Sequence, residues 1–485
     1  MKASISLLIV LGVAIQACLM PEELRWEVLR KKGKAPQIYP DYLKTTSGRD
    51  KGNGLRVGVK GQRGKDRFLN GSVLPQGIGR RTDIPFNILN LKEIESGIRG
   101  LVNNYEYVRH ITGRYRTYEN REIHGFRIGD NPIAYIQSGV HARERGGPDN
   151  LLFFFADLLD AAWNGKGLTY GRKSYSAREV RDAVSVDVVV VPAINLDGIA
   201  WDQRTNTCWR KNRRPATTGH RMPGTGTGVD LDRNFDFLWD YKRYFDVNTY
   251  YKAANIASDY PASLVYHGVH PASEPETRNV VEWMQEYTNV SWFVDIHSFS
   301  SDHTGSVFYA WGDDDTQYAE PELNFLNSTY DGIRGRLDES PDRLLWPQPY
   351  REYMEEEDIR AQVGLARNMA AGMTATGNLS YLVDQHADIG PKSGSATDYF
   401  LSKYYGHRCN ASLINGITIQ FGAHSGLHCP FYPDLGLYQT SMKEVAAGLM
   451  EFLLWVKDVK GQNWRAKKWK CETENAKPNE DGGTK

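Results

Sequence analysis

Residues 133–144 read IAYIQSGVHARE, a short apolar run followed by a histidine and a glutamate three residues apart. The run over residues 133–137 has the length of a β-strand, so the two polar residues lie just past a strand end. Three further apolar runs of strand length occupy residues 186–194, 292–296 and 413–421. The chain therefore carries at least four candidate buried strands.

The stretches between these runs have apolar residues at helical spacing. They cover residues 88–102, 149–162, 276–287 and 442–459. Strands that alternate with helices predict an α/β fold, with a mostly parallel mixed sheet covered by helices on both faces. Ligands are expected at the carboxyl ends of the strands of such a sheet.

Composition limits the classes of function. The 485 residues include 59 Lys and Arg and 59 Asp and Glu, so the formal net charge is zero. A hydrophobic share of 40% and a charged share of 24% are typical of a globular protein and exclude wholesale disorder. Because no global charge attracts it to nucleic acid or to anionic lipid, we expect neither as a partner.

The N-terminus is typical of a secretory signal. Lys2 precedes an apolar run over residues 5–17 that is too short to cross a bilayer and that ends in small residues. No other stretch approaches the length of a membrane span. We therefore expect a signal peptide over residues 1–18 and a secreted, extracellular protein.

Three further segments are expected after this signal. Residues 19–84 include a basic, glycine-interleaved stretch over 49–67 and are interpreted as a flexible or pro-segment region, with Arg80-Arg81 as a candidate processing point. Residues 85–460 hold the strands and helices and form the main domain. Residues 461–485 are a polar tail.

Modification sites fit an oxidising compartment. After signal removal four cysteines remain, Cys208, Cys409, Cys429 and Cys471, and an even set of four allows three disulfide connectivities. Sequons for N-glycosylation occur five times, at Asn70, Asn289, Asn327, Asn378 and Asn410.

Two strand ends carry side chains of the types that bind metal ions in proteins. His141 and Glu144 follow the first strand, and His297 follows the strand WFVDI. Two histidines and a glutamate are the ligand set of a catalytic zinc, which leaves a fourth position open. Taken alone, each of these residues is more often surface charge or a satisfied strand-end residue.

The surrounding motifs decide between these readings. Residues 208–213 read CWRKNR, 228–235 read GVDLDRNF and 295–300 read DIHSFS, and they follow the His141/Glu144 motif in that order. This set resembles the zinc metallocarboxypeptidases of the pancreatic carboxypeptidase A and B kind, and is most similar to their secreted bacterial and fungal relatives. The resemblance covers roughly residues 85–460 and implies one zinc per chain, held by His141, Glu144 and His297.

The resemblance also implies roles for other residues. Asp230 matches a carboxylate that orients the first zinc histidine. Arg210 would polarise the scissile carbonyl, and Arg233 would bind the terminal carboxylate of a peptide as a fork.

Several substrate-handling positions depart from the family pattern. Residues 417–422 read ITIQFG, so Gln420 stands where the family has its general-base glutamate, and an amide oxygen does not accept a proton at accessible pH. Asp232 replaces an asparagine beside Arg233, where a carboxylate repels a carboxylate ligand or occupies the arginine.

In residues 389–399, IGPKSGSATDY, Ile389 or Gly390 replaces the family's mobile tyrosine. By the same resemblance Thr397, or alternatively Ala396, would fall at the floor of the side-chain pocket.

We therefore predict a secreted, zinc-binding metallocarboxypeptidase-like protein that is weakly active or inactive and binds peptide or protein C-termini at the zinc groove. The alternative is an active carboxypeptidase whose base is another carboxylate. No glutamate occurs between Glu357 and Glu444, which leaves Asp232 or Asp384 as substitutes. A third alternative is hydrolysis of some other amide at the same metal. The sequence does not predict an oligomeric state.

Overall fold

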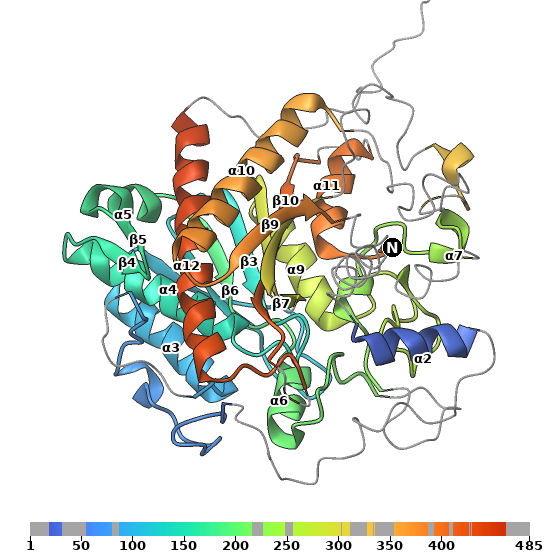
Figure 1. Cartoon of the computed structure of the whole chain (residues 1–485), viewed down its shortest axis with the longest axis horizontal. Helices are drawn as coiled ribbons and strands as arrows, with labels where there is room; N and C mark the ends of the chain where they lie inside the picture. Colours follow the sequence, from blue (N-terminus) through green and yellow to red (C-terminus); the bar gives the residue numbers. More distant parts are fainter. Residues whose placement is uncertain are drawn as a thin grey trace, which may run out of the picture.

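The computed structural model (Figure 1) describes most of the chain after the expected signal peptide. The described residues are 19–31, 55–79, 87–215, 227–247, 256–301, 303–310, 327–332, 334, 354–386, 392–406, 411–425, 427 and 429–461.

An eight-stranded sheet forms the centre of the molecule, with the order β1-β2-β6-β3-β7-β10-β8-β9. Its strands are β1 (Val108–Thr112), β2 (His124–Ile128), β3 (Ala134–Ser138), β6 (Val188–Val191), β7 (Trp292–Ser301), β8 (Thr304–Tyr309), β9 (Ser380–Gln385) and β10 (Asn415–Ala423). A separate hairpin consists of β4 (Leu168–Tyr170) and β5 (Lys173–Tyr175).

The sheet is mixed, with a parallel centre. β3 pairs in parallel with both β6 and β7, and β7 pairs in parallel with β10. β8 and β9 are also parallel, whereas the β1–β2, β2–β6 and β8–β10 pairs are antiparallel. Parallel strands end at the same edge, so the residues that follow β3 and those late in β7 and β10 are brought together.

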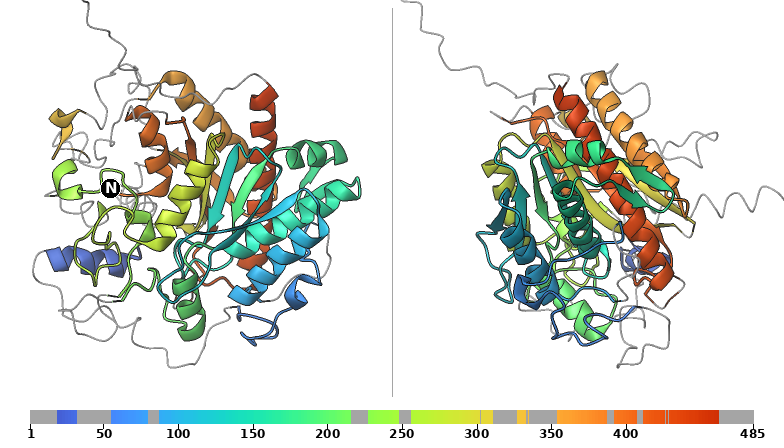
Figure 2. Two further views of the ribbon diagram at one scale, coloured as in Figure 1. Left: turned by 180° about the vertical axis from the view of Figure 1, so that it is seen from behind. Right: turned by 90° about the vertical axis from the view of Figure 1, so that its left-hand side faces the viewer.

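Helices connect and cover these strands. They are α2 (Pro21–Lys31), α3 (Leu91–Asn104), α4 (Gly147–Trp163), α5 (Ala177–Val184), α6 (Leu196–Thr205), α7 (Tyr241–Tyr244), α9 (Pro275–Glu286), α10 (Glu356–Ala375), α11 (Ala396–Tyr405) and α12 (Leu435–Gly461). Short 3-10 turns lie at η3 (Leu69–Gly71), η4 (Leu231–Arg233) and η6 (Ser328–Tyr330). Figures 1 and 2 show α10 and α12 side by side against the sheet.

The strands pack into two cores because successive side chains point to opposite faces. Ile136, Val190 and Val294 pack with α3, α4, α10 and α12. Tyr135 and Phe293 pack with α9 and α11 on the other face. The predicted α/β fold, with helices on both faces of a mostly parallel mixed sheet, is therefore confirmed.

The region expected to be flexible or a pro-segment, residues 19–84, contains two packed parts. Residues 55–79 lie against the main domain: Val57 and Phe68 are in its larger core, and the amides of Gly77 and Gly79 donate to Asp157. The other part is α2. Arg80-Arg81 and residues 1–18 lie outside the described residues.

A disulfide joins Cys208 to Cys429, with an S–S distance of 2.08 Å. This selects one pair from the connectivities that the sequence left open, and Cys409 and Cys471 lie outside the described residues. Asn70, Asn289 and Asn378 are exposed. Asn327 is half-buried, and Asn410 is outside the described part. None of the helices in the described part is long and apolar enough to span a bilayer.

Candidate metal centre

Three predicted metal ligands meet at the edge of the parallel strands. His141 and Glu144 lie in the loop between β3 and α4, and Gly146, at a φ of 103°, turns this loop into the helix. His297 lies in β7, one step beyond the level of Ser138 at the end of β3. One atom from each ligand lies within 4.8 Å of the others, and all three residues are buried.

The donor atoms of these residues converge. Nδ1 of His297 lies 3.1 Å from Nδ1 of His141 and 3.0 Å from Oε2 of Glu144. Nδ1 of His141 lies 2.7 Å from Oε1 of Glu144. No other group of three histidine, cysteine or acidic residues in the described chain has a comparable spacing.

Two aspartates orient the histidines from behind. Nε2 of His141 lies 3.1 Å from Oδ1 of Asp230, and Nε2 of His297 lies 3.2 Å from Oδ2 of Asp295. A carboxylate at Nε2 fixes the tautomer and leaves the Nδ1 lone pair directed to a common point. Gln137 in turn donates to Oδ2 of Asp295 at 3.0 Å.

The local charges favour an ionised glutamate. Burial acts to raise the pKa of Glu144, but His141 and His297 outweigh it and hold that pKa below the ordinary value. Burial acts to lower the pKa of His297, yet Asp295 and Glu144 hold it well above its usual range. Both shifts have the same physical cause, the attraction between the imidazoles and the neighbouring carboxylates.

These donors fit zinc, because two imidazole nitrogens and a carboxylate of fixed orientation are a zinc ligand set. A bound zinc supplies an acidified water and a Lewis acid for a carbonyl oxygen. His141, Glu144 and His297 would hold one such ion.

Arg210 is placed beside this centre by its contact with Asp230. Its Nη2 donates to Oδ2 of Asp230 at 2.9 Å, and its Nη1 lies 3.9 Å from Oε1 of Glu144. Burial acts to raise the pKa of Asp230, but Arg210 and His141 hold it well below its ordinary value. Asp230 thus links the first histidine to the arginine expected to meet a carbonyl.

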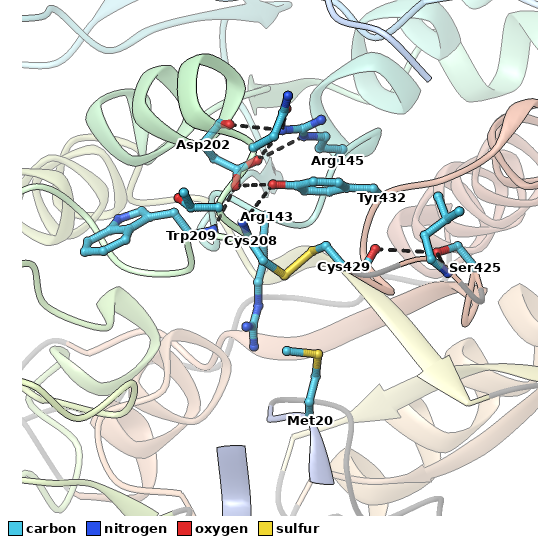
Figure 3. Close-up of a disulfide and its surroundings, with 12 residues drawn as sticks. Met20, Arg143, Arg145, Asp202, Cys208, Trp209, Ser425, Cys429 and Tyr432 are labelled. Atoms are coloured by element: carbon cyan, nitrogen blue, oxygen red, sulfur yellow. Dashed lines mark hydrogen bonds and ion pairs between the residues drawn. A yellow bond between two sulfur atoms is a disulfide. The ribbon is translucent and has the colours of Figure 1, made fainter. Parts of the chain in front are cut away.

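The disulfide supports the loop that carries Arg210 (Figure 3). The hydroxyl of Tyr432 accepts from the amide of Cys208 at 2.9 Å and donates to Asp202 at 2.6 Å. Arg145, directly after Glu144, donates to Asp202 and stacks on the Tyr432 ring at 3.5 Å. The metal loop and the Arg210 loop therefore share one set of supports.

The predicted carboxylate clamp contains internal ion pairs. Nη1 of Arg233 lies 3.2 Å from Oδ2 of Asp232, and Nζ of Lys392 lies 3.8 Å from the same oxygen. All three side chains are buried. Burial acts to raise the pKa of Asp232, but Lys392 and Arg233 outweigh it and lower that pKa. The Arg233 guanidinium, the predicted clamp, is therefore already paired with the carboxylate of Asp232.

Thr397, the predicted floor of the side-chain pocket, lies at the start of α11 against β10. Its Oγ1 lies 2.9 Å from Oγ1 of Thr418, two residues before Gln420, and both threonines are buried. Ile389 and Gly390, at the position of the mobile tyrosine, lie outside the described residues.

Gln420 lies beside the metal ligands. It is paired with His297 in the parallel β7–β10 register, so the two side chains leave the same face of the sheet. Gln420 is 2% exposed, and its Oε1 has no hydrogen-bond partner among the described residues.

Asp384 is far from this position. It lies on β9, which is separated from β10 by β8, and it is in register with Phe308, itself opposite Thr418. Two strand spacings of about 4.8 Å separate Asp384 from β10, and β7 lies one strand further away. Asp384 is therefore too distant to act as a base at the metal centre.

Comparison with known proteins agrees with this geometry. A family model described as zinc carboxypeptidase matches residues 94–421, more than half of the chain. The chain belongs to the zinc carboxypeptidase family. Carboxypeptidase A4 of Mus musculus is 29% identical over 190 residues, which are 38% of this chain and 38% of that protein. Carboxypeptidase B of Astacus astacus is 29% identical over 225 residues, 45% of this chain and 63% of that protein.

The matched part of the chain thus spans less than two thirds of the length of these curated relatives. Among solved structures, thrombin activatable fibrinolysis inhibitor aligns with a TM-score of 0.53 and 17% identity, covering 77% of this chain and 75% of that one. Carboxypeptidase A of Helicoverpa armigera aligns with a TM-score of 0.51 and 18% identity, covering 78% and 77%. These structures show that the zinc carboxypeptidase fold is shared.

Sequence reasoning did not assign three residues that the structure places in or around the metal centre and the predicted clamp. Asp295 precedes His297 by two positions in one strand, so strand periodicity places both on the same face and could have identified it. Arg143 lies between the two ligands of the metal loop, but its position in the sequence does not indicate a role. Lys392 gave no usable signal, because only the fold brings it to Asp232.

Proposed function

We propose that this zinc carboxypeptidase family member binds zinc and peptide or protein C-termini at its metal centre, with little or no hydrolysis. Its ligand set and supporting aspartates are those of a working metal site. The general-base position, now Gln420, and the position beside the clamp arginine, now Asp232, are altered.

The observation that carries this proposal is the position of Gln420. It lies beside His297 on the neighbouring strand, where a carboxylate would accept a proton from the attacking water. General-base assistance of this kind contributes about 10²–10⁴-fold to a rate. The amide of Gln420 donates and accepts hydrogen bonds but removes no proton, so it supports binding better than hydrolysis.

The aspartates offered as substitutes do not favour the active-enzyme alternative. Asp232 is held by Arg233 and Lys392, and its lowered pKa makes it a weak base. Asp384 is two strands away from Gln420.

Secretion is part of the same proposal. It is supported by the leader-like residues 1–18 and by the Cys208–Cys429 disulfide, because such bridges persist in oxidising compartments. The exposed sequons at Asn70, Asn289 and Asn378 are the positions proposed for glycosylation.

Binding without cleavage tests the proposal. Zinc-loaded and chelator-stripped protein would be titrated with N-blocked dipeptides ending in phenylalanine or arginine, and the recovered peptide analysed by chromatography. We expect about one zinc per chain, zinc-dependent binding and intact peptide. Rapid release of the terminal amino acid, or equal binding by metal-free protein, would contradict it.

A further inference from the structure

The helix α2 lies against loops that surround the metal centre, although it precedes the main domain by more than fifty residues. Figures 1 and 2 show it on the side opposite α5. Residues 19–31, which comprise α2 and the two residues before it, contact the main domain at Arg143 in the metal loop, at the disulfide with residues 431–432, and at residues 263–265.

The first contact is a buried ion pair next to the metal ligands. Glu23 of α2 accepts from Arg143 at both oxygens, Oε1 from Nη1 at 2.5 Å and Oε2 from Nη2 at 3.0 Å. Both side chains are fully buried. The Arg143 guanidinium also stacks on the ring of Phe431 at 4.1 Å. Because Arg143 lies between His141 and Glu144 in the chain, Glu23 is bound within the loop that holds the metal.

The second contact lies one helical turn further along α2. Glu27 accepts from Oγ of Ser263 at 2.7 Å and from the amide of Leu264 at 3.1 Å. Nζ of Lys211, the residue after Arg210, donates to the carbonyl of the same Ser263 at 2.9 Å. Glu27 is fully buried and is held by donors from the main domain.

Apolar contacts complete the interface. Leu24, Trp26 and Val28 of α2 pack with Leu264 and Val265. Met20 packs with the disulfide, Phe431 and Tyr432, and Figure 3 shows the Arg143 guanidinium pointing toward it.

These contacts have the chemistry of ligand recognition. A buried carboxylate–arginine pair adds little net stability, whereas removal of one partner leaves an uncompensated buried charge. Glutamates at positions i and i+4 lie on one face of a helix, so Arg143 and the Ser263 loop select two acidic groups at one spacing. We propose that the surface formed by Arg143, Phe431 and residues 263–265 is a docking site for an acidic helix, and that α2 is its intramolecular occupant. The inference rests on the proposed binding function and names the partner class: a helix with two glutamates one turn apart.

A partner in trans must then displace α2. Because α2 is tethered to the domain, its effective concentration is high, and the apparent affinity for a free peptide is reduced. Weakening the contacts of α2 should expose this surface without altering the residues that form it.

The test uses the full chain and a synthetic peptide of residues 19–31, LMPEELRWEVLRK, labelled with fluorescein. The variant carries Glu23→Gln and Glu27→Gln together, and the control carries Glu106→Gln and Glu357→Gln, both at exposed positions. Hydrogen exchange measures protection of the α2 amides, and fluorescence anisotropy measures binding. A second peptide has glutamine at positions 23 and 27 only.

We expect α2 amides of the double variant to exchange at least tenfold faster than those of wild type and control. The double variant should bind the native peptide at least tenfold more tightly than the glutamine peptide, and more tightly than wild type does. Unchanged protection of α2, or equal binding of the two peptides, would overturn the inference. If the double variant does not fold, Glu27→Gln alone, remote from the metal loop, replaces it with the same expectations.

Failure of this inference can be distinguished from failure of the proposed function. Docking of the α2 peptide depends on Arg143 and the Ser263 loop, whereas binding of blocked dipeptides depends on zinc. Either measurement can therefore fail while the other succeeds.

Discussion

Asp295 holds Nε2 of His297 at 3.2 Å and is 1% exposed, so its charge fixes the ring that presents Nδ1 to the metal. We predict that Asp295→Asn weakens zinc affinity by roughly 10- to 100-fold, because a carboxylate behind a ligating histidine orients it and raises its basicity. Competition with a chromophoric chelator measures the affinity. Asp384→Asn, exposed on β9, is the matched control, and an unchanged affinity for Asp295→Asn would contradict the assigned role.

At the residue scale, the sequence predicts which side chains come together at the metal centre. It does not predict which ion pairs the neighbouring charged side chains form. His141, Glu144, His297 and Asp230 come together as expected, because their strands and loops end at one edge. The ion pairs of Asp232 with Arg233 and Lys392 depend on a loop whose position only the tertiary fold sets.

At the scale of elements, the disulfide joins two loops rather than two strands or helices. Cys208→Ser with Cys429→Ser should lower the free energy of unfolding by about 2–5 kcal/mol, since the bridge closes a long loop in the unfolded chain. Denaturant unfolding measures the change. A reductant should destabilise the wild type more than the double variant; a reductant effect of equal size in both would contradict the prediction.

The start of α9 contains a carboxyl group that ionises with difficulty. Burial, with a contribution from Glu274, raises the pKa of Glu276 from its ordinary value of 4.5 to about 8. Because the folded pKa is the higher one, the stability contributed by the protonated form is present below about pH 4.5 and is lost as the pH rises through 8.

We predict that Glu276→Gln abolishes this pH-dependent loss of stability. The loss in the wild type amounts to roughly 1.4 kcal/mol of unfolding free energy for each unit by which the folded pKa exceeds the unfolded pKa. The free energy of unfolding of the variant should therefore gain on that of the wild type between pH 5 and 8. Denaturant unfolding across this range measures it, with the exposed Glu286→Gln on the same helix as control. Parallel pH profiles for wild type and Glu276→Gln would refute the raised pKa.

The helices and strands that could be predicted from the sequence are those with a strong apolar pattern. The four central strands β3, β6, β7 and β10 and the helices α3, α4, α9 and α12 match the predicted runs within a few residues at most ends. The strands β1 and β9 have exposed faces and short apolar content, so their sequences gave no comparable signal. Helix α10 was not predicted either. It is half exposed and carries three acidic residues in its first turn.

At the scale of the whole molecule, residues 55–79 are joined to the main domain by a charged contact. Nε of Arg67 donates to Oε1 of Glu93 at 2.5 Å, and Glu93 is fully buried. The composition of the 49–67 stretch gave no indication of this packing, because its basic residues find partners only when the domain is folded.

Arg67→Ala should lower the free energy of unfolding by about 2–3 kcal/mol, somewhat less than for a fully buried pair because Arg67 is 22% exposed. Arg360→Ala, which removes the exposed Arg360–Glu356 pair, is the control and should change it by less than about 0.5 kcal/mol. Thermal and denaturant unfolding measure both. Equal effects of the two substitutions would show that the Arg67–Glu93 contact does not stabilise the folded domain.

The central claim is that the metal centre is retained while its proton acceptor is lost. The most direct measurement is the kcat/KM of zinc-loaded wild type and Gln420→Glu for blocked dipeptides, with zinc content determined for both and Gln420→Ala as control. We predict equal zinc content, little wild-type turnover and a gain of about 10²-fold for Gln420→Glu alone. Zinc-dependent wild-type turnover that equals or exceeds that of Gln420→Glu would contradict the claim.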